Sequence, residues 1–158
     1  MKSPKEMLPL SEAVTHLLEE CRMVLPGIQA LFGFQLIAVF NSTFRERLSP
    51  TEQSFHLAAI GLVAIAVALV MTPAALHRQT SPRAATQDFI ATATRLLLMS
   101  MFPLMLGISL DFYLIARLIP NNTLASILLS TALLILFATL WFLLPRLSFL
   151  QKIIRGSI

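Results

Sequence analysis

Asp111 is the side chain with the clearest chemical potential, because it interrupts an apolar stretch, 96–119, that is long enough to cross a bilayer. An ionised carboxylate near a bilayer centre costs about 2.5–3.5 kcal/mol on insertion scales, so it must pair with a partner, face water or take up a proton. Three interpretations follow: a protonatable or cation-binding site, a buried hydrogen bond that joins two helices, or a side chain that reaches outward to Arg117 or to the outer surface.

Helical geometry predicts a partner for this carboxylate. Ser100 and Gly107 lie within about 40° of Asp111 on one helix face. If the first apolar stretch crosses the membrane in the same direction, Gln35 lies within about 3–5 Å of Asp111 in depth. The sequence therefore predicts a hydrogen bond between Gln35 and Asp111, with Asn41 as the alternative partner.

Gln29 is a second amide in the first apolar stretch. It differs from Gln35 by about 120° around the helix, so the two cannot both line one narrow path without distortion. Together with Asp111, these two glutamines form the candidate set for handling an ion or a proton.

The other titratable side chains suggest little catalytic chemistry. His77 and Arg78 end the second apolar stretch, where they could bind a lipid phosphate or sense pH, or serve as a stop signal and interfacial anchor. His16 and His56 are interpreted as single interfacial residues that make no site. Cys21 is expected to be a reduced thiol, with palmitoylation as the alternative. No metal site, cofactor or enzymatic activity is expected, because the sequence contains no zinc cluster and no Gly-rich phosphate loop.

The elements that must position these residues follow from composition. Of the 158 residues, 56% are hydrophobic and 13% are charged, and the mean hydropathy is +0.78, whereas a typical globular domain carries about 25% charged residues. So short a chain cannot bury this much apolar surface in water. The long apolar stretches predict an all-α integral membrane bundle of four transmembrane helices, at 23–44, 55–76, 96–119 and 123–144. They form one domain, 23–145, between an N-terminal segment, 1–22, and a tail, 146–158.

The N-terminal segment is predicted to be an amphipathic helix on the membrane surface. It contains acidic residues and no long apolar run, so it does not resemble a signal peptide. Its apolar positions recur at helical spacing after a cap at Ser11: Val14, Leu17, Leu18 and Cys21. Pro26-Gly27 is then expected to turn the chain into the bilayer.

The positive charges predict the orientation. Nine lie on one side of the predicted membrane: Lys2, Lys5, Arg22, Arg78, Arg83, Arg95, Arg146, Lys152 and Arg155. The other side has Arg45, Arg47 and Arg117. Because cytoplasmic loops carry the excess of Lys and Arg, both termini are expected to be cytoplasmic. The net charge of +4 is assigned to this topology signal, and no nucleic-acid surface is expected.

Local motifs predict where the connections lie. Residues 49–52, Ser-Pro-Thr-Glu, form a capping box that starts the second helix. Ser81-Pro82 is a similar motif and predicts an interfacial helix over 82–95. Residues 120–122, Pro-Asn-Asn, predict a tight turn between the last two helices.

Small residues predict the packing face of the second helix. They recur three or four positions apart, at Gly61, Ala64, Ala68, Thr72 and Ala75. Such a stripe lets helices approach closely in lipid, either within the chain or in a dimer.

Prolines within or beside the apolar stretches are candidate kinks. They are Pro26 (with the adjacent Gly27), Pro73 and Pro103. Each could form a gate, although proline is common in membrane helices.

Two short segments carry a family resemblance. Residues 22–36, which include Leu-Pro-Gly-x-Gln, resemble the first-span signature of a family of small bacterial inner-membrane proteins of unknown function. Residues 73–78, Pro-Ala-Ala-x-His-Arg, are similar to its second signature. The resemblance covers about 19–78 and implies four transmembrane helices, a bacterial inner membrane and no established activity. It gives added weight to Arg22, Pro26, Gly27, Gln29 and Gln35.

Two functions fit these observations. A structural or accessory membrane subunit needs only packing faces and interfacial helices. A small oligomeric proton- or cation-coupled transporter or channel would use Asp111, with Gln29 or Gln35 facing a shared axis. The expected partners are the lipid bilayer and either further copies of the chain or a larger membrane complex.

Overall fold

The computed structural model describes residues 9–80, 86–119 and 122–147, and within these ranges every regular element is a helix. The elements are α1 (Leu10–Ala38), α2 (Ser42–Arg47), α3 (Pro50–Thr80), α4 (Gln87–Leu118) and α5 (Thr123–Ala138), which continues as a π-helical turn (Thr139–Leu143) and a 3₁₀ turn (Leu144–Arg146). Four of the described helices are long and apolar enough to cross a membrane. The chain is therefore all-α and has the character of a multi-pass membrane protein.

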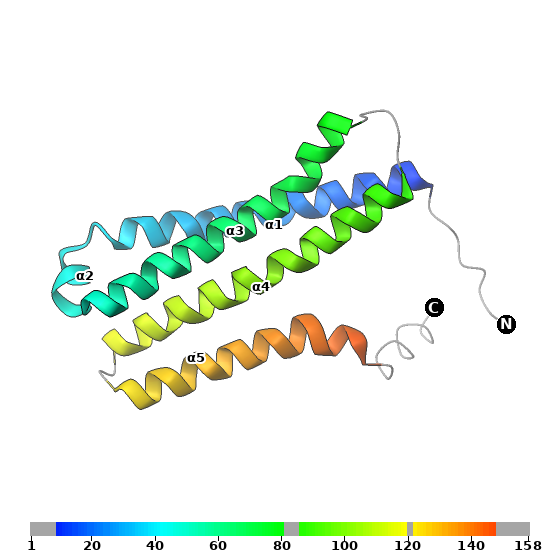
Figure 1. Cartoon of the computed structure of the whole chain (residues 1–158). Helices are drawn as coiled ribbons and strands as arrows, with labels where there is room; N and C mark the ends of the chain where they lie inside the picture. Colours follow the sequence, from blue (N-terminus) through cyan, green and yellow to red (C-terminus); the bar gives the residue numbers. More distant parts are fainter. Residues whose placement is uncertain (1–8, 81–85, 120–121, 148–158) are drawn as a thin grey trace.

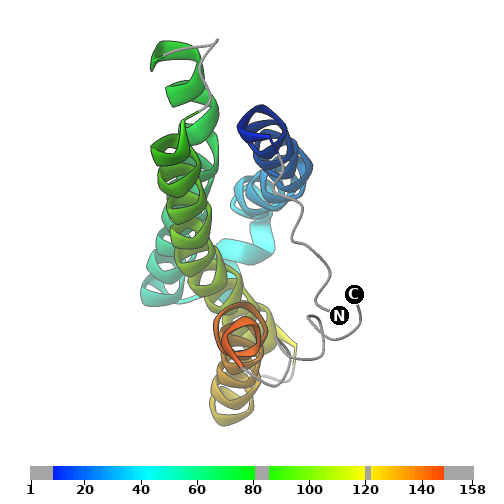
Figure 2. The ribbon, with the colours of Figure 1, turned by 90° about the vertical axis from the view of Figure 1, so that its right-hand side faces the viewer.

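The long helices lie side by side (Figure 1). α3 and α4 share the most extensive interface, α1 packs against both of them, and α5 packs against α4. Viewed from the end, α3, α4 and α5 follow one another, with α1 beside α3 and α4 (Figure 2). The start of α1 and the end of α5 lie at the same end of the molecule, as expected when four helices cross a membrane in alternating directions (Figure 1).

A glycine makes the close contact between α3 and α4. A Cβ atom added to Gly107 would lie 3.0 Å from Cγ2 of Val63 and 3.1 Å from the backbone oxygen of Ala59. On α3, the completely or almost completely buried positions are Ala59, Val63, Ala66, Val70 and Pro73. Because these residues recur at helical spacing, one face of α3 is pressed against α4.

The small-residue stripe predicted on α3 lies away from this interface. Gly61, Ala64 and Ala68 are exposed, and nothing lies within 4 Å of a Cβ atom added to Gly61. Thr72 is half-buried, and its hydroxyl donates to the Ala68 carbonyl of the same helix. Packing of this stripe within the chain is therefore a wrong prediction. The face that packs is centred about two residues away, roughly 200° around the helix, where α4 presents Gly107.

α1 is a single helix, and this corrects the prediction of a separate surface helix. It begins at Leu10 after Pro9, rather than after a cap at Ser11, and continues through Pro26. Leu17 and Cys21 belong to a buried cluster with Val63 and Val70 of α3. The amphipathic face of the N-terminal segment therefore packs on protein instead of lying on lipid.

Two connections differ in their bounds from the prediction. α1 ends at Ala38 rather than near residue 44, and Asn41 caps the short helix α2 by accepting from the Thr43 backbone amide. α4 begins at Gln87 with Thr86 as its cap and runs without a break to Leu118, so there is no separate interfacial helix up to Arg95. Ser81-Pro82 lies outside the described residues.

The capping box before α3 is confirmed. The Glu52 backbone amide donates to Ser49 Oγ, and Glu52 Oε2 accepts from the Ser49 backbone amide at 2.9 Å. Before α5, Asn122 Oδ1 accepts from the Leu124 and Ala125 amides, while residues 120–121 lie outside the described part of the chain.

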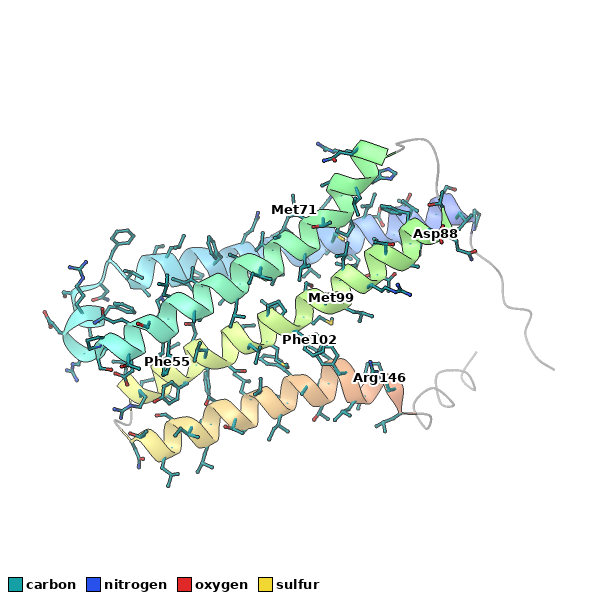
Figure 3. The ribbon with its side chains drawn as sticks, viewed as in Figure 1. Phe55, Met71, Asp88, Met99, Phe102 and Arg146 are labelled. Atoms are coloured by element: carbon teal, nitrogen blue, oxygen red, sulfur yellow. The ribbon has the colours of Figure 1, made fainter. Side chains whose placement is uncertain are left out.

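Prolines and aromatic rings shape the paths of α3, α4 and α5 beyond the middle of the molecule, away from α2. Pro73 is buried inside α3, and the helix diverges from α4 beyond Met71 (Figure 3), as expected where proline removes a backbone hydrogen bond. Pro103 lies within α4 without ending it. Phe102, in the middle of α4, stacks on Phe142 of the π-helical turn that follows α5, with ring centroids 4.3 Å apart.

Candidate functional site

The predicted hydrogen bond between α1 and α4 is present. Gln35 Nε2 donates to Asp111 Oδ2. Gln35 is only 3% exposed, and the Asp111 side chain is 14% exposed. The carboxylate is thus held inside the helix packing, in contact with an amide from a neighbouring helix.

His56 of α3 completes the site, although the sequence interpretation assigned it to no site. Its Nδ1 lies 2.9 Å from Asp111 Oδ1, and its Nε2 lies 2.9 Å from the backbone oxygen of Gln35. The ring also contacts Phe44 of α2, with centroids 5.0 Å apart. One imidazole therefore links the carboxylate of α4 to the backbone of α1.

The contacts of His56 fix the proton count of this site. A carbonyl oxygen only accepts, so Nε2 must carry a hydrogen that it donates to Gln35. The contact between Nδ1 and Oδ1 then needs one further proton, either on the imidazole or on the carboxyl group. In both arrangements the net charge of the pair is zero, so a single proton is shared between His56 and Asp111.

Helix packing brings the three residues to one depth. Gln35 is in the last turn of α1. His56 is six residues after the start of α3, and Asp111 is seven residues before the end of α4, which places them about 9 Å and about 10 Å along their helices. In Figure 3 the neighbouring residue Phe55 lies at the end of α3 next to α2. Applied to the predicted span 55–76, the depth comparison that predicted Gln35 places His56 about 8 Å nearer the membrane surface than Asp111, so it did not identify His56.

The site lines a mostly apolar cavity of about 290 Å³. Its polar lining side chains are Gln35, His56 and Asp111, and the remaining lining comes from α1, α2 with the following Leu48, and α4: Leu31, Phe34, Ala38, Phe44, Leu48, Ile108, Phe112, Leu114, Ile115 and Leu118. A small number of polar groups in an apolar pocket is the usual construction of a small-molecule site.

One polar atom at the site has no partner. Gln35 Oε1 is buried and accepts no hydrogen bond within the described structure. The amide cannot resolve this by turning, because its Nε2 is needed as the donor to Asp111. Ser109 Oγ is also unpartnered, but Ser109 lines a different, more open cavity against α5.

Arg117 does not pair with Asp111, and this corrects one of the interpretations of the carboxylate. Its Nε donates to Glu52 Oε1 at 3.2 Å, further toward the end of α4. Glu52 is therefore both the capping residue of α3 and the ion-pair partner of Arg117. Asp111 is left to its contacts with His56 and Gln35.

Other predicted site residues are not brought to this cavity. Gln29, Pro26 and Gly27 are exposed on α1. Asn41 caps α2 instead of contacting Asp111.

The proposed anchor pair lies at the far end of α3. The half-buried ring of His77 contacts Phe89 of α4, with centroids 5.6 Å apart, and Arg78 is exposed. Neither residue is near the cavity. Over residues 9–80, 86–119 and 122–147 no group of three His, Cys, Asp or Glu residues is placed to hold a metal ion.

Comparison with known proteins places the chain in a family. No curated protein and no solved structure matches it. A protein-family model described as "Family of unknown function (DUF6328)" matches residues 10–145, which include all the long helices and the cavity residues. The family resemblance seen in two short segments of the first half thus extends over most of the sequence. The chain belongs to the family of unknown function DUF6328.

Proposed function

We propose that this protein handles protons within a bacterial inner membrane and that His56 and Asp111 are the carrying pair. The observation that supports the proposal is the direct contact between His56 Nδ1 and Asp111 Oδ1, at 2.9 Å, beside a cavity. A carboxylate within a transmembrane helix marks proton and ion pathways in many membrane proteins. Histidine adds a group that gains and loses a proton near physiological pH.

Gln35 has a positioning role in this proposal. Its Nε2 donates to Asp111 Oδ2 whichever atom holds the shared proton, so it keeps the carboxyl group oriented toward His56. The proton can then move between the imidazole and the carboxyl group without a change in the net charge of the pair.

The test is proton flux into liposomes that contain the purified full chain, under an imposed membrane potential and with a pH-sensitive dye inside. Asp111→Asn is expected to reduce the flux to that of protein-free liposomes, because the new amide cannot release a proton. The matched control is Asp88→Asn, the same chemical change at an exposed position in the first turn of α4, and it is expected to keep the wild-type rate. Equal flux in wild type and Asp111→Asn would refute the proposal.

A structural or accessory subunit is the second candidate. The supporting observation is that the same network ties three helices together, since His56 bonds to both α1 and α4. In this case Asp111→Asn leaves the protein assembled and changes no flux. Light scattering of the detergent-solubilised protein, alone and after co-purification from its native membrane, would test for a homo-oligomer or a larger complex.

A further inference from the structure

Gln35, which lines the cavity beside His56 and Asp111, has a hydrogen-bonding capacity that the described structure leaves unused. Gln35 Oε1 is a buried acceptor without a donor, and only 3% of the Gln35 surface is exposed. A buried acceptor without a partner costs free energy, because it has lost its hydrogen bonds to water. A bound molecule with an N–H or O–H donor would remove this cost, so the site favours a ligand that donates hydrogen bonds.

The charge of the site favours a cation. The pair of His56 and Asp111 is neutral with its shared proton and carries one negative charge without it. A positively charged ligand can therefore take the place of the proton and keep the site neutral. An anion would meet a carboxylate in an apolar surrounding, which is strongly unfavourable.

The cavity walls favour an organic cation over Ca²⁺ or Mg²⁺. Ca²⁺ and Mg²⁺ take about six or more oxygen ligands, whereas the side-chain oxygens of the cavity lining come from Gln35 and Asp111. Most of the lining is aliphatic, with aromatic rings from Phe34, Phe44 and Phe112. Aromatic rings attract organic cations, and the aliphatic lining suits an apolar ligand body.

The acceptors of the site match a primary ammonium group in number. Once the shared proton has left, the unpaired acceptors are Asp111 Oδ1, His56 Nδ1 and Gln35 Oε1, while Asp111 Oδ2 still accepts from Gln35 Nε2. A primary ammonium group carries three N–H donors. A quaternary ammonium ion has the same charge but no N–H donor, and it leaves Gln35 Oε1 unpaired.

We propose that the cavity binds a lipophilic primary ammonium ion in exchange for the proton shared by His56 and Asp111. The inference rests on the proposed function, because it requires that the pair can release its proton. In the exchange, the N–H···O or O–H···N bond between His56 and Asp111 breaks and its proton passes to water. The ammonium group then donates to the vacated acceptors, so one positive charge leaves and one enters.

The charged groups around the pair are consistent with exchange of a single proton. α1 contributes no titratable side chain within two turns of Gln35, and α3 contributes Glu52, which is paired with Arg117 of α4. The nearest other titratable groups are Tyr113 of α4, whose ring contacts Phe55, and the exposed residues Arg45, Glu46 and Arg47 of α2. None of these contacts Asp111 or His56 among the described hydrogen bonds and ion pairs.

The first test is calorimetry on the purified full chain, in nanodiscs of phosphatidylcholine, with phenethylammonium as the probe. Titrations in buffers of different ionisation enthalpy count the protons released. Close to one proton per bound probe is expected below the pH at which the pair loses its proton. In that range the affinity should fall about tenfold for each unit by which the pH is lowered, as single-proton linkage requires. The probe is protonated throughout, so this trend reports on the protein.

A matched ligand tests the role of the unpaired acceptor. Phenethyltrimethylammonium has the same charge and aromatic body but no N–H donor, and it is expected to bind about tenfold or more weakly, which corresponds to the loss of a charge-assisted hydrogen bond. Gln35→Met keeps the side-chain length but removes both Oε1 and the Nε2 donor to Asp111, so the overall affinity for both probes is expected to change, but the preference for the primary over the quaternary ammonium should shrink. Both comparisons use proteins that retain Asp111, so they do not depend on how well a carboxylate variant folds.

The carboxylate variants complete the test. Asp111→Asn should lose binding of phenethylammonium, while Asp88→Asn should bind as wild type does. Binding without proton release, or equal binding to Asp111→Asn, would overturn the inference and leave the cavity as an apolar pocket for a lipid chain. If liposomes show proton flux that depends on Asp111 but phenethylammonium does not bind, the inference is wrong and the proposed function stands. Absence of both flux and binding refutes both.

Discussion

At the scale of single residues, the shared proton dominates the behaviour of the site. His56 Nε2 is committed to the Gln35 carbonyl, and Gln35 Nε2 is committed to Asp111 Oδ2. The variable element is the hydrogen between His56 Nδ1 and Asp111 Oδ1. Substitutions at Asp111 can therefore separate the geometry of the network from its capacity to exchange a proton.

Asp111→Asn is expected to keep the free energy of unfolding near that of the wild type, whereas Asp111→Ala is expected to lower it. The new amide oxygen can accept from Gln35 Nε2, and the new amide nitrogen can donate to a neutral His56. Alanine leaves both partners buried and unsatisfied, at a cost of about 1–3 kcal/mol for each group. SDS-driven unfolding in mixed micelles, followed by circular dichroism, measures the difference. Equal destabilisation by the two substitutions would show that the native pair is held as an ion pair.

At the scale of the helices, close approach of α3 to α4 sets the geometry of the site. Gly107 lies one turn before Asp111 on α4, and Ala59, which it contacts, lies three residues after His56 on α3. The contact between the two helices is therefore adjacent to the contact between imidazole and carboxylate. A side chain added at Gly107 should therefore widen the spacing between α3 and α4 and change the distance between His56 and Asp111.

Gly107→Ala is expected to destabilise the protein by about 1–3 kcal/mol, the usual cost of overpacking. The added methyl group would meet Val63 Cγ2 and the Ala59 carbonyl near 3 Å, and the carbonyl cannot move without its helix. Proton flux should fall as well, because His56 and Asp111 are moved apart.

Gly61→Ala is the control for this substitution, since its added methyl group meets no atom within 4 Å. It should leave stability and flux unchanged. Comparable losses from both substitutions in the unfolding assay would mean that the exposed small-residue face of α3 is also packed, as in an oligomer.

At the scale of the whole molecule, the chain places its site near one end of the bundle. Gln35, His56 and Asp111 lie toward the end covered by α2, and the described chain begins and ends at the other end. The distribution of Lys and Arg predicts that the end with α2 faces outward from the cytoplasm. The cavity would then be nearer the outer surface of the membrane.

Cysteine labelling tests this orientation in a Cys21→Ala background. Ser42→Cys lies on exposed α2, and Gln87→Cys lies at the exposed start of α4. A membrane-impermeant maleimide should label the first variant in cells with a permeabilised outer membrane and the second only after the inner membrane is lysed. The reverse pattern would invert the topology and place the site near the cytoplasm.

Features that depend on local composition and on the fixed rise of a helix could be predicted from the sequence. Apolar stretches indicated the four membrane-crossing helices, because the free energy of burying a residue in lipid is nearly additive along the chain. The capping box at Ser49 and Glu52 was predictable because its bonds join near neighbours. Depth along parallel helices was enough to pair Gln35 with Asp111.

Which face of each helix meets which neighbour became known only from the folded structure. Rotation of α3 brought His56 to Asp111, directed Glu52 to Arg117 and left the stripe at Gly61 exposed. Leu17 and Cys21, near the start of α1, likewise pack against α3 instead of facing lipid. Lipid solvates every apolar face almost equally well, so hydropathy cannot choose among rotations. Close contact at Gly107 and the pairing of buried polar groups make that choice, because both depend on residues far apart in the chain.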